Sequence, residues 1–148
     1  MNFAMPQLGR SWDEWRMAKS SLFQVCKKGF DQSLSVPLPG EDYERFELST
    51  GDFTEWKSVS VPIGKAVMFR ANGACSMPLH SHESPEILHL LSGKLAIVVE
   101  AETTILNPGE SHVTKAGKAH SAYYIEPGEC FCHWPALESD RMTIDVLA

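Results

Sequence analysis

Three histidines and one glutamate have the residue types and the spacing of ligands to a single metal ion. His80 and His82 are two positions apart, so on a β-strand both side chains would point to the same face, about 6.6 Å apart. Glu86 lies a further even number of steps along, and its carboxylate returns to that face if the chain keeps its alternation. His120 begins another β-prone run just after a turn at Gly117. We therefore predict one site from these four side chains.

The predicted ligands define a class of ions. Neutral imidazoles with one carboxylate are borderline donors, which suit divalent Fe, Mn, Ni, Zn or Cu rather than Ca or Mg. Four protein ligands leave a position open on an ion that prefers five or six. A substrate or dioxygen would bind at that position.

The segment around these residues resembles the first motif of the cupin superfamily. That motif runs from Gly through His-x-His, three or four residues, Glu, six residues and a final Gly. The run His80-Ser81-His82, Glu86 and Gly93 reproduce this half of the spacing. The one departure is that six residues rather than five separate Gly73 from the first histidine, which suggests a slightly longer turn.

A later segment resembles the second cupin motif, which runs Gly, five residues, Pro-x-Gly, two residues, His, three residues, Asn. Gly109, Gly117 and His120 occupy the expected positions. Lys115 replaces the proline and Tyr124 replaces the asparagine. Both departures lie at framework positions, so they affect the expected strand pairing more than the metal site.

The resemblance spans roughly residues 56–135 and implies both a fold and a ligand set. The fold is all-β, a cupin-type (jelly-roll) β-barrel with a metal in its mouth, bound by His80, His82, Glu86 and His120. Cupins include dioxygenases, isomerases and lyases, so the fold does not choose the reaction. Cupin barrels often pair through edge strands, and we therefore also expect a homodimer.

Two further residues are candidates for a catalytic role. Alternation from His120 places Tyr124 on the inner face, where its hydroxyl would orient a ligand or donate a proton; the simpler interpretation is an aromatic side chain that fills the barrel. Arg70 would bind a carboxylate substrate if it points inward. Its neighbours are apolar on both alternations, so its direction stays open.

The other histidines are expected to lie outside the site. His89 is an odd step from Glu86 and should face away from the ion, and we interpret it and His112 as surface or hydrogen-bonded residues. A zinc cluster of His133 with Cys130 and Cys132 is disfavoured, because adjacent residues on a strand point to opposite faces.

The four cysteines, Cys26, Cys75, Cys130 and Cys132, are not spaced C-x-x-C, so neither a zinc ribbon nor a thioredoxin-like redox site is indicated. The last two would share one face of a strand, which is poor geometry for a disulfide. We expect all four to be reduced thiols that serve in packing.

Short β-prone runs separated by turn residues occupy most of the chain after residue 43. The runs are 43–48, 53–61, 65–71, 86–91, 94–99, 103–106, 111–114, 121–125, 130–133 and 142–147. Ser92-Gly93 and Pro127-Gly128 are two of the turn signals between them. About ten strands at this spacing indicate a β-sandwich or barrel.

The N-terminal part has a different pattern. Ser11 and Glu14 form a capping box and Gly29 stands where a helix normally ends, so we predict a helix over residues 11–28. Its apolar stripe either covers an open face of the main domain or contacts a second subunit. Residues 30–42 are predicted to be a surface connection. The expected organisation is an N-terminal α-helical arm, 1–42, followed by a barrel domain, 43–148.

Composition excludes several classes of protein. The 148 residues are 43% hydrophobic and 22% charged, which is typical of a globular domain and not of a disordered or fibrous chain. The net charge of −6 repels phosphate backbones, so nucleic acid is not an expected partner. No apolar run approaches the roughly 18 residues that span a bilayer, and no signal peptide is visible, so no membrane partner and a cytoplasmic location are expected.

Two classes of function fit these residues, and a third is possible. The chain is either an enzyme that uses its metal on a small organic molecule, or a non-catalytic module that senses or stores a small ligand or a metal. The complete ligand set with open coordination favours the enzyme. In the third class the ion only stabilises the barrel. Loss of stability on chelation, without turnover, would distinguish that class.

Overall fold

The structure, a computed structural model, describes residues 32–47, 51–73 and 76–146. The helix predicted over 11–28 lies outside the described residues, as do Cys26 and Cys75. Within the described ranges every regular element is a β-strand. The strands are β1 (Gln32–Pro37), β2 (Glu44–Glu47), β3 (Phe53–Val59), β4 (Lys65–Ala71), β5 (Ser76–His82), β6 (Glu86–Val99), β7 (Glu102–Leu106), β8 (Ser111–Thr114), β9 (His120–Trp134) and β10 (Arg141–Val146).

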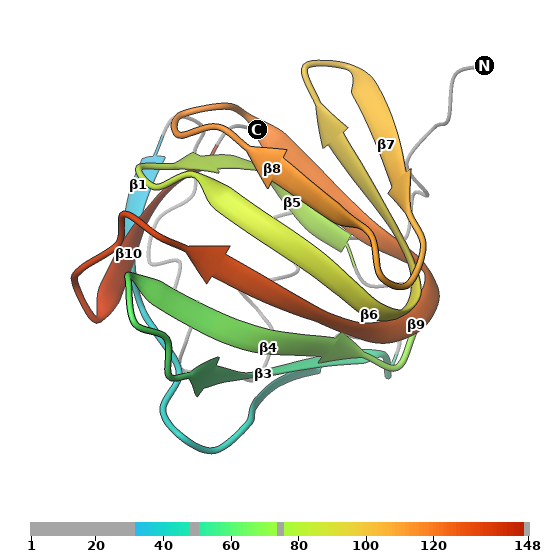
Figure 1. The fold of residues 1–148 in the computed structure, drawn as a ribbon, viewed down its shortest axis with the longest axis horizontal. Coiled ribbons are helices and arrows are strands. Elements are labelled where there is room, and N and C mark those ends of the chain that lie inside the picture. Colours follow the sequence, from blue (N-terminus) through green and yellow to red (C-terminus); the bar gives the residue numbers. More distant parts are fainter. Residues whose placement is uncertain (1–31, 48–50, 74–75, 147–148) are drawn as a thin grey trace.

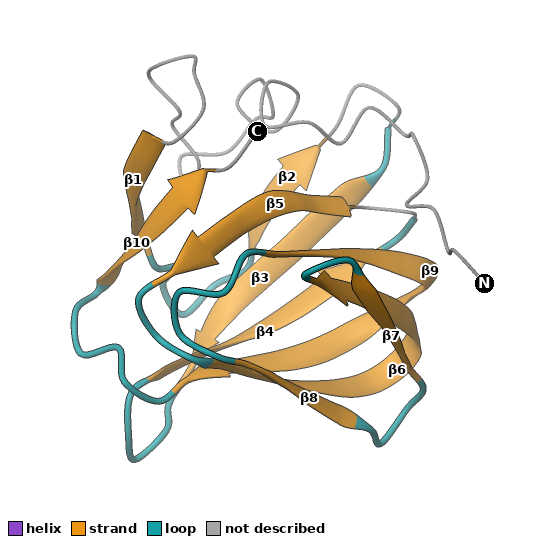
Figure 2. Ribbon diagram, turned by 90° about the horizontal axis from the view of Figure 1, so that it is seen from above, coloured by secondary structure: helices purple, strands orange, loops and turns teal. Residues whose placement is uncertain are grey.

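The ten strands form one sheet that curls around a common interior (Figures 1 and 2). Its order is β1-β10-β5-β9-β4-β3-β2, and β6 pairs with β7, β8 and β9. Every strand pair is antiparallel. The all-β architecture predicted from the sequence is therefore confirmed. In the described part of the chain, no helix is long and apolar enough to cross a membrane.

β6 and β9 form a long paired ladder through two sites where the sequence predicts turns. Both Ser92-Gly93 and Pro127-Gly128 lie inside strands, and the register between β6 and β9 shifts there. Gly93 adopts φ +81°, and a Cβ atom at Gly93 or at Gly128 would collide with the backbone of the other strand. The glycines therefore allow a close, bulged crossing of two continuous strands rather than chain reversals.

Two strands do not coincide with any predicted β-prone run. β1 pairs residue for residue with β10, so the prediction of a surface connection is wrong for Gln32–Pro37, and the sheet begins before residue 43. β5 carries His80 and His82 and pairs with β10 and β9. Its register on β9 shifts between Met77 and His80, around Pro78, a residue that has no N–H to donate to a ladder.

The hydrophobic core fills the interior of the curled sheet. Alternation along β4 sets which residues enter it: Val67 is 1% exposed and Phe69 packs against the core, whereas Met68 and Arg70 belong to the opposite face. Met68 is paired with Phe131 on β9. Neither Met68 nor Phe131 belongs to the core, whereas Leu88, Leu90 and Trp134 are buried in it.

Candidate metal centre

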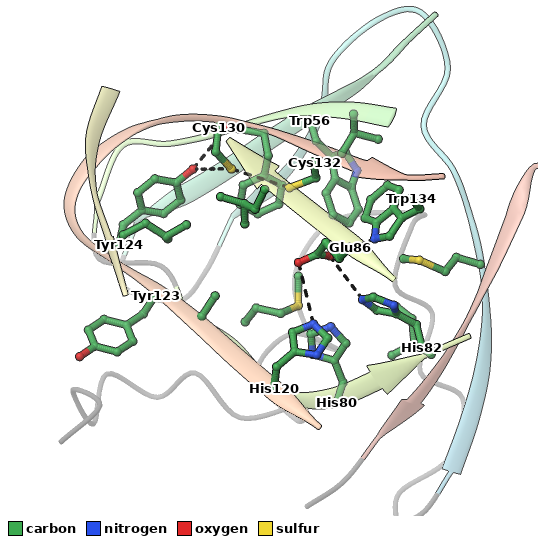
Figure 3. A pocket seen from close by; sticks show the side chains of 18 residues that line it. Trp56, His80, His82, Glu86, His120, Tyr123, Tyr124, Cys130, Cys132 and Trp134 are labelled. Carbon is green, nitrogen blue, oxygen red and sulfur yellow. Dashed lines mark hydrogen bonds and ion pairs between the residues drawn. The ribbon is translucent and has the colours of Figure 1, made fainter. Parts of the chain in front are cut away.

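The fold brings the three predicted histidine ligands together from β5 and β9. His80 and His120 are directly opposite each other in the β5–β9 pairing, and their ring centroids are 4.3 Å apart. The His82 ring lies 4.8 Å from the His120 ring and 5.5 Å from the His80 ring. One ligand atom from each residue lies within 4.8 Å of the others. All three side chains are buried and line one cavity (Figure 3).

A backbone contact ties the two halves of the site together. The turn that precedes β9 contains Gly117 at φ +76°, a conformation that favours glycine. The Gly117 N–H donates to the His82 carbonyl at 3.0 Å. The turn therefore docks on the end of β5, and His120, three residues later, enters the sheet beside His80.

Backbone carbonyls orient two of the imidazoles. His82 Nδ1 lies 2.8 Å from the Ser84 carbonyl oxygen, and His120 Nδ1 lies 2.9 Å from the Lys118 carbonyl oxygen. A carbonyl can only accept, so each Nδ1 carries a proton, and each Nε2 is the nitrogen left to bind an ion. This is the arrangement in which proteins hold imidazole ligands to metals.

The Nε2 atoms of His82 and His120 are buried, and neither makes a hydrogen bond within the described structure. Unsatisfied buried polar atoms are costly, and a metal ion would satisfy both. A shared ion with bonds of about 2.1 Å would hold its ligand nitrogens at most about 4.2 Å apart, so small side-chain adjustments would bring the three imidazoles onto one ion. The residues therefore fit a divalent transition metal.

Glu86 lies next to the histidines, at the first position of β6. Its Oε2 is 3.3 Å from His82 Nε2 and its Oε1 is 3.9 Å from His120 Nε2. Trp134 Nε1 donates a 2.9 Å hydrogen bond to the same Oε2 (Figure 3). The carboxylate is thus held between the indole and the imidazoles.

Electrostatics keep Glu86 and His120 in the protonation states that metal ligands need. Burial raises the pKa of Glu86, but contact with His82 and the charges of the three histidines outweigh it and hold the pKa at about 2. Burial lowers the pKa of His120, which favours the neutral ring. For His82, burial lowers the pKa, but the contact with Glu86 outweighs it and the pKa is raised.

The cavity beside these residues is mostly apolar and small. Its volume is about 70 Å³, and one water needs roughly 10–15 Å³. It therefore has room for several waters or for part of a small organic ligand. No Lys or Arg occurs among the described residues that line it. The lining comprises Trp56, Val67, Phe69, Met77, His80, His82, Glu86, Leu88, Leu95, His120, Ala122, Tyr123, Tyr124, Cys130, Cys132, Trp134, Met142 and Ile144.

The two candidate catalytic residues lie in different places. Tyr124 lines the cavity, but its hydroxyl donates to the Phe69 carbonyl at 3.3 Å and lies 3.3 Å from Cys130 Sγ, among the core residues. Arg70 is not part of the cavity lining. Its guanidinium pairs with Glu55 on the other face of the sheet and stacks over the Tyr43 ring, 3.8 Å from the centroid.

The remaining histidines are hydrogen-bonded to groups outside the ligand set, as expected for His89 and His112. His89 Nδ1 lies 2.5 Å from Ser111 Oγ, and His112 Nδ1 lies 3.4 Å from Thr114 Oγ1. His133 Nε2 lies 2.8 Å from the Ile63 carbonyl. Trp134 is a site residue that the sequence does not predict, because its contact with Glu86 crosses 48 positions and no local pattern indicates it.

A curled antiparallel sheet with three buried imidazoles at one cavity is the architecture of a cupin-type β-barrel with a candidate metal site. Residues 66–134 match the sequence model of the family Cupin_2, described as "Cupin domain", and this range contains both motifs. This range of the chain therefore matches a cupin domain, as the motifs predict. No curated protein matches the chain significantly in sequence.

Solved structures share the fold at low sequence identity. KdgF from Halomonas sp. is 20% identical, with 72% of this chain and 87% of that chain covered and a TM-score of 0.52. An RmlC-like cupin from Shewanella frigidimarina is 18% identical, with coverage of 76% and 95% and a TM-score of 0.54. Salicylate 1,2-dioxygenase from Pseudoaminobacter salicylatoxidans is 14% identical, with coverage of 55% and 25% and a TM-score of 0.52.

Proposed function

We propose that the protein is an enzyme that acts on a small organic molecule with a divalent transition metal held by His80, His82, Glu86 and His120. The observation that carries this proposal is the pair of buried, unsatisfied Nε2 atoms whose rings are fixed by backbone carbonyls. The Glu86 carboxylate, which accepts a hydrogen bond from the Trp134 indole, completes the ligand set. Three imidazoles and one carboxylate suit Fe, Mn, Ni, Zn or Cu.

When bound, such an ion supplies Lewis-acid chemistry or a site for dioxygen. The residues of the chain position the metal ligands and form the surroundings of the site. The Ser84 and Lys118 carbonyls fix the donor faces of two imidazoles. The Trp134 N–H holds one carboxylate oxygen of Glu86. The mostly apolar cavity wall provides surroundings of low dielectric constant, which strengthen electrostatic interactions with a bound substrate.

The absence of Lys and Arg from the described cavity lining restricts how a substrate is held. Arg70, the candidate for binding a carboxylate, is engaged by Glu55 elsewhere. A substrate would therefore be held by its own donor atoms at the imidazole site and by apolar contacts. We favour an oxygenase or an isomerase or lyase reaction. Salicylate 1,2-dioxygenase has this fold, but fold alone does not choose among these reactions.

Metal analysis of the untagged protein tests the ligand set. We expect His80→Ala and His120→Ala each to lose most of one ion per chain relative to the wild type, because each removes a direct ligand. His89→Ala is the matched control, since His89 bonds to Ser111 outside the cavity. Equal metal content in all four proteins would refute the site.

Turnover is tested separately on the metal-loaded protein. We expect oxygen uptake or product formation with at least one member of a metabolite library, lost in His120→Ala and retained in His89→Ala. Binding of a library member without any turnover would instead identify a non-catalytic small-ligand module, which is the alternative function.

A further inference from the structure

A second group of metal-ligand side chains lies in the same cavity, away from the imidazoles. Cys130 and Cys132 are 2% and 7% exposed, and their Sγ atoms are 3.8 Å apart. The Tyr124 hydroxyl is 3.3 Å from Cys130 Sγ. Figure 3 shows this trio on the opposite side of Glu86 from His80 and His120. Both cysteines are free thiols.

Strand alternation explains why the two thiols meet. Cys130 and Cys132 are two apart on β9 and point inward, whereas Phe131 and His133 point outward, where their rings pack on each other. The cross-strand neighbours of the thiols on β4 are Phe69 and Val67. On β6 they are Leu90 and Leu88. Polarizable sulfur is thus concentrated within an apolar wall.

The distance between the sulfur atoms distinguishes two uses of the pair. A disulfide requires about 2.05 Å, far below the observed 3.8 Å. Two thiolates on one tetrahedral Zn²⁺, with Zn–S bonds of about 2.3 Å, stand about 3.8 Å apart. The sulfur atoms already have the spacing of two ligands on a tetrahedral ion.

We propose that Cys130 and Cys132, with the hydroxyl of Tyr124 beside them, form a second site for a thiophilic divalent cation such as Zn²⁺ or Cd²⁺. This thiol site does not depend on whether the imidazole site binds an ion. Both cysteines line the cavity, through which the ion would enter.

Charge favours a divalent ion at this position. Two thiolates and one divalent cation form a neutral group, which is the form that apolar surroundings tolerate best. Contact with Cys130 and burial raise the pKa of Cys132, so without a cation the Cys132 thiol holds its proton. Binding therefore releases two thiol protons to solvent as the two metal–sulfur bonds form.

The two sites differ in the ions that they select. Thiolates prefer soft cations, whereas imidazole and carboxylate are borderline or hard donors. Cd²⁺ is therefore a suitable probe, because its bonds to thiolate produce an ultraviolet charge-transfer absorption that bonds to imidazole do not. Cys26 and Cys75 would confuse this signal, so the test uses a Cys26→Ser/Cys75→Ser background kept reduced with a phosphine.

Titration of this protein with Cd²⁺ should give the thiolate absorption, saturating at one ion per chain at the thiol site. Cys130→Ser and Cys132→Ser should each reduce it by at least half, because one of the two thiolates is removed, and should weaken binding there by more than the roughly 10–100-fold typical of losing an outer-sphere partner. His80→Ala should retain it. Absorption that is undiminished in either serine variant, or that never appears in the parent, would overturn the proposal.

A second measurement avoids substitution of the buried pair. In the same background, Cd²⁺ should protect Cys130 and Cys132 from alkylation, read by peptide mass spectrometry, in both the parent and His80→Ala. Alkylation at an unchanged rate would overturn the thiol site even if the serine variants failed to fold. So would a mass lower by two hydrogens in protein prepared without the phosphine, which would show that the two cysteines form a disulfide.

Discussion

The indole Nε1 of Trp134 donates a 2.9 Å hydrogen bond to Glu86 Oε2. These residues are the last of β9 and the first of β6, and the adjacent pair Ile87 and His133 holds the two strand ends in register. A hydrogen bond to an ionised group is stronger and more directional than one between neutral groups. Trp134 is therefore a positioning residue for the carboxylate as well as a core residue.

Replacing Trp134 with Phe keeps an aromatic ring but removes the donor. We expect metal affinity to fall by roughly 10–100-fold, the usual effect of losing an outer-sphere partner. The free energy of unfolding of the metal-free protein should fall by about 1.5–3 kcal/mol, because the hydrogen bond is to a charged group. Calorimetric metal titration and urea unfolding measure these two quantities.

Trp56→Phe is the matched control, because Trp56 lines the same cavity but packs its ring on Phe69. Metal affinity should stay close to the wild-type value in this variant. An equal loss of affinity in Trp56→Phe and Trp134→Phe would mean that general cavity packing, and not the Glu86 contact, determines metal binding.

The part of the site that could be predicted from sequence is the part encoded by local spacing. The two-residue step from His80 to His82 indicates a shared strand face, and Gly117 predicts the turn that leads into His120. The link from Trp134 to Glu86 could not be predicted, because it depends on the register of β6 on β9. That register shifts three times between Leu90 and Leu95.

We expect the unfolding free energy of the metal-free protein at acid pH to depend on the ionised state of Glu86. Its folded pKa of about 2 lies below the ordinary glutamate value of 4.5. A depressed carboxylate pKa contributes stability above pH 4.5, and this contribution is lost as the pH falls towards about 2. We expect Glu86→Gln to flatten the decline of the unfolding free energy in that window. Urea unfolding as a function of pH measures this decline of the unfolding free energy.

Glu83→Gln, in the exposed turn after β5, is the control for the acid experiment. It removes one carboxylate near the site without touching the cavity. A pH profile for Glu86→Gln that overlays both the wild type and Glu83→Gln would show that Glu86 is not the group responsible.

The sequence does not indicate which side chains of β4 point into the barrel. Residues 66–71 are apolar on both faces except for Arg70, so hydropathy does not indicate the inner side. The structure resolves it because Phe69 packs between Trp56 and Tyr124. Arg70 is consequently on the outer face, with Glu55 and Tyr43.

Arg70→Ala should therefore leave metal content and ligand affinity unchanged. We expect only a small loss in the free energy of unfolding, because the guanidinium is largely exposed and Glu55 keeps a second partner, Arg45. A double-mutant cycle with Glu55→Gln measures the pair. Selective loss of affinity for carboxylate ligands in Arg70→Ala would instead place this residue in substrate binding.

Removal of the metal should lower thermal stability through simple linkage. An ion present at 100 times its Kd stabilises the folded state by about 2.7 kcal/mol. For a domain of this size, each kcal/mol shifts Tm by roughly 2–4 °C, so chelation should lower Tm by about 5–11 °C. In His120→Ala, chelation should change Tm by much less, since a direct ligand is missing. An equal Tm shift in both proteins would place the stabilising ion elsewhere. A shift without any turnover or ligand binding by the loaded protein would assign the imidazole site a purely structural role.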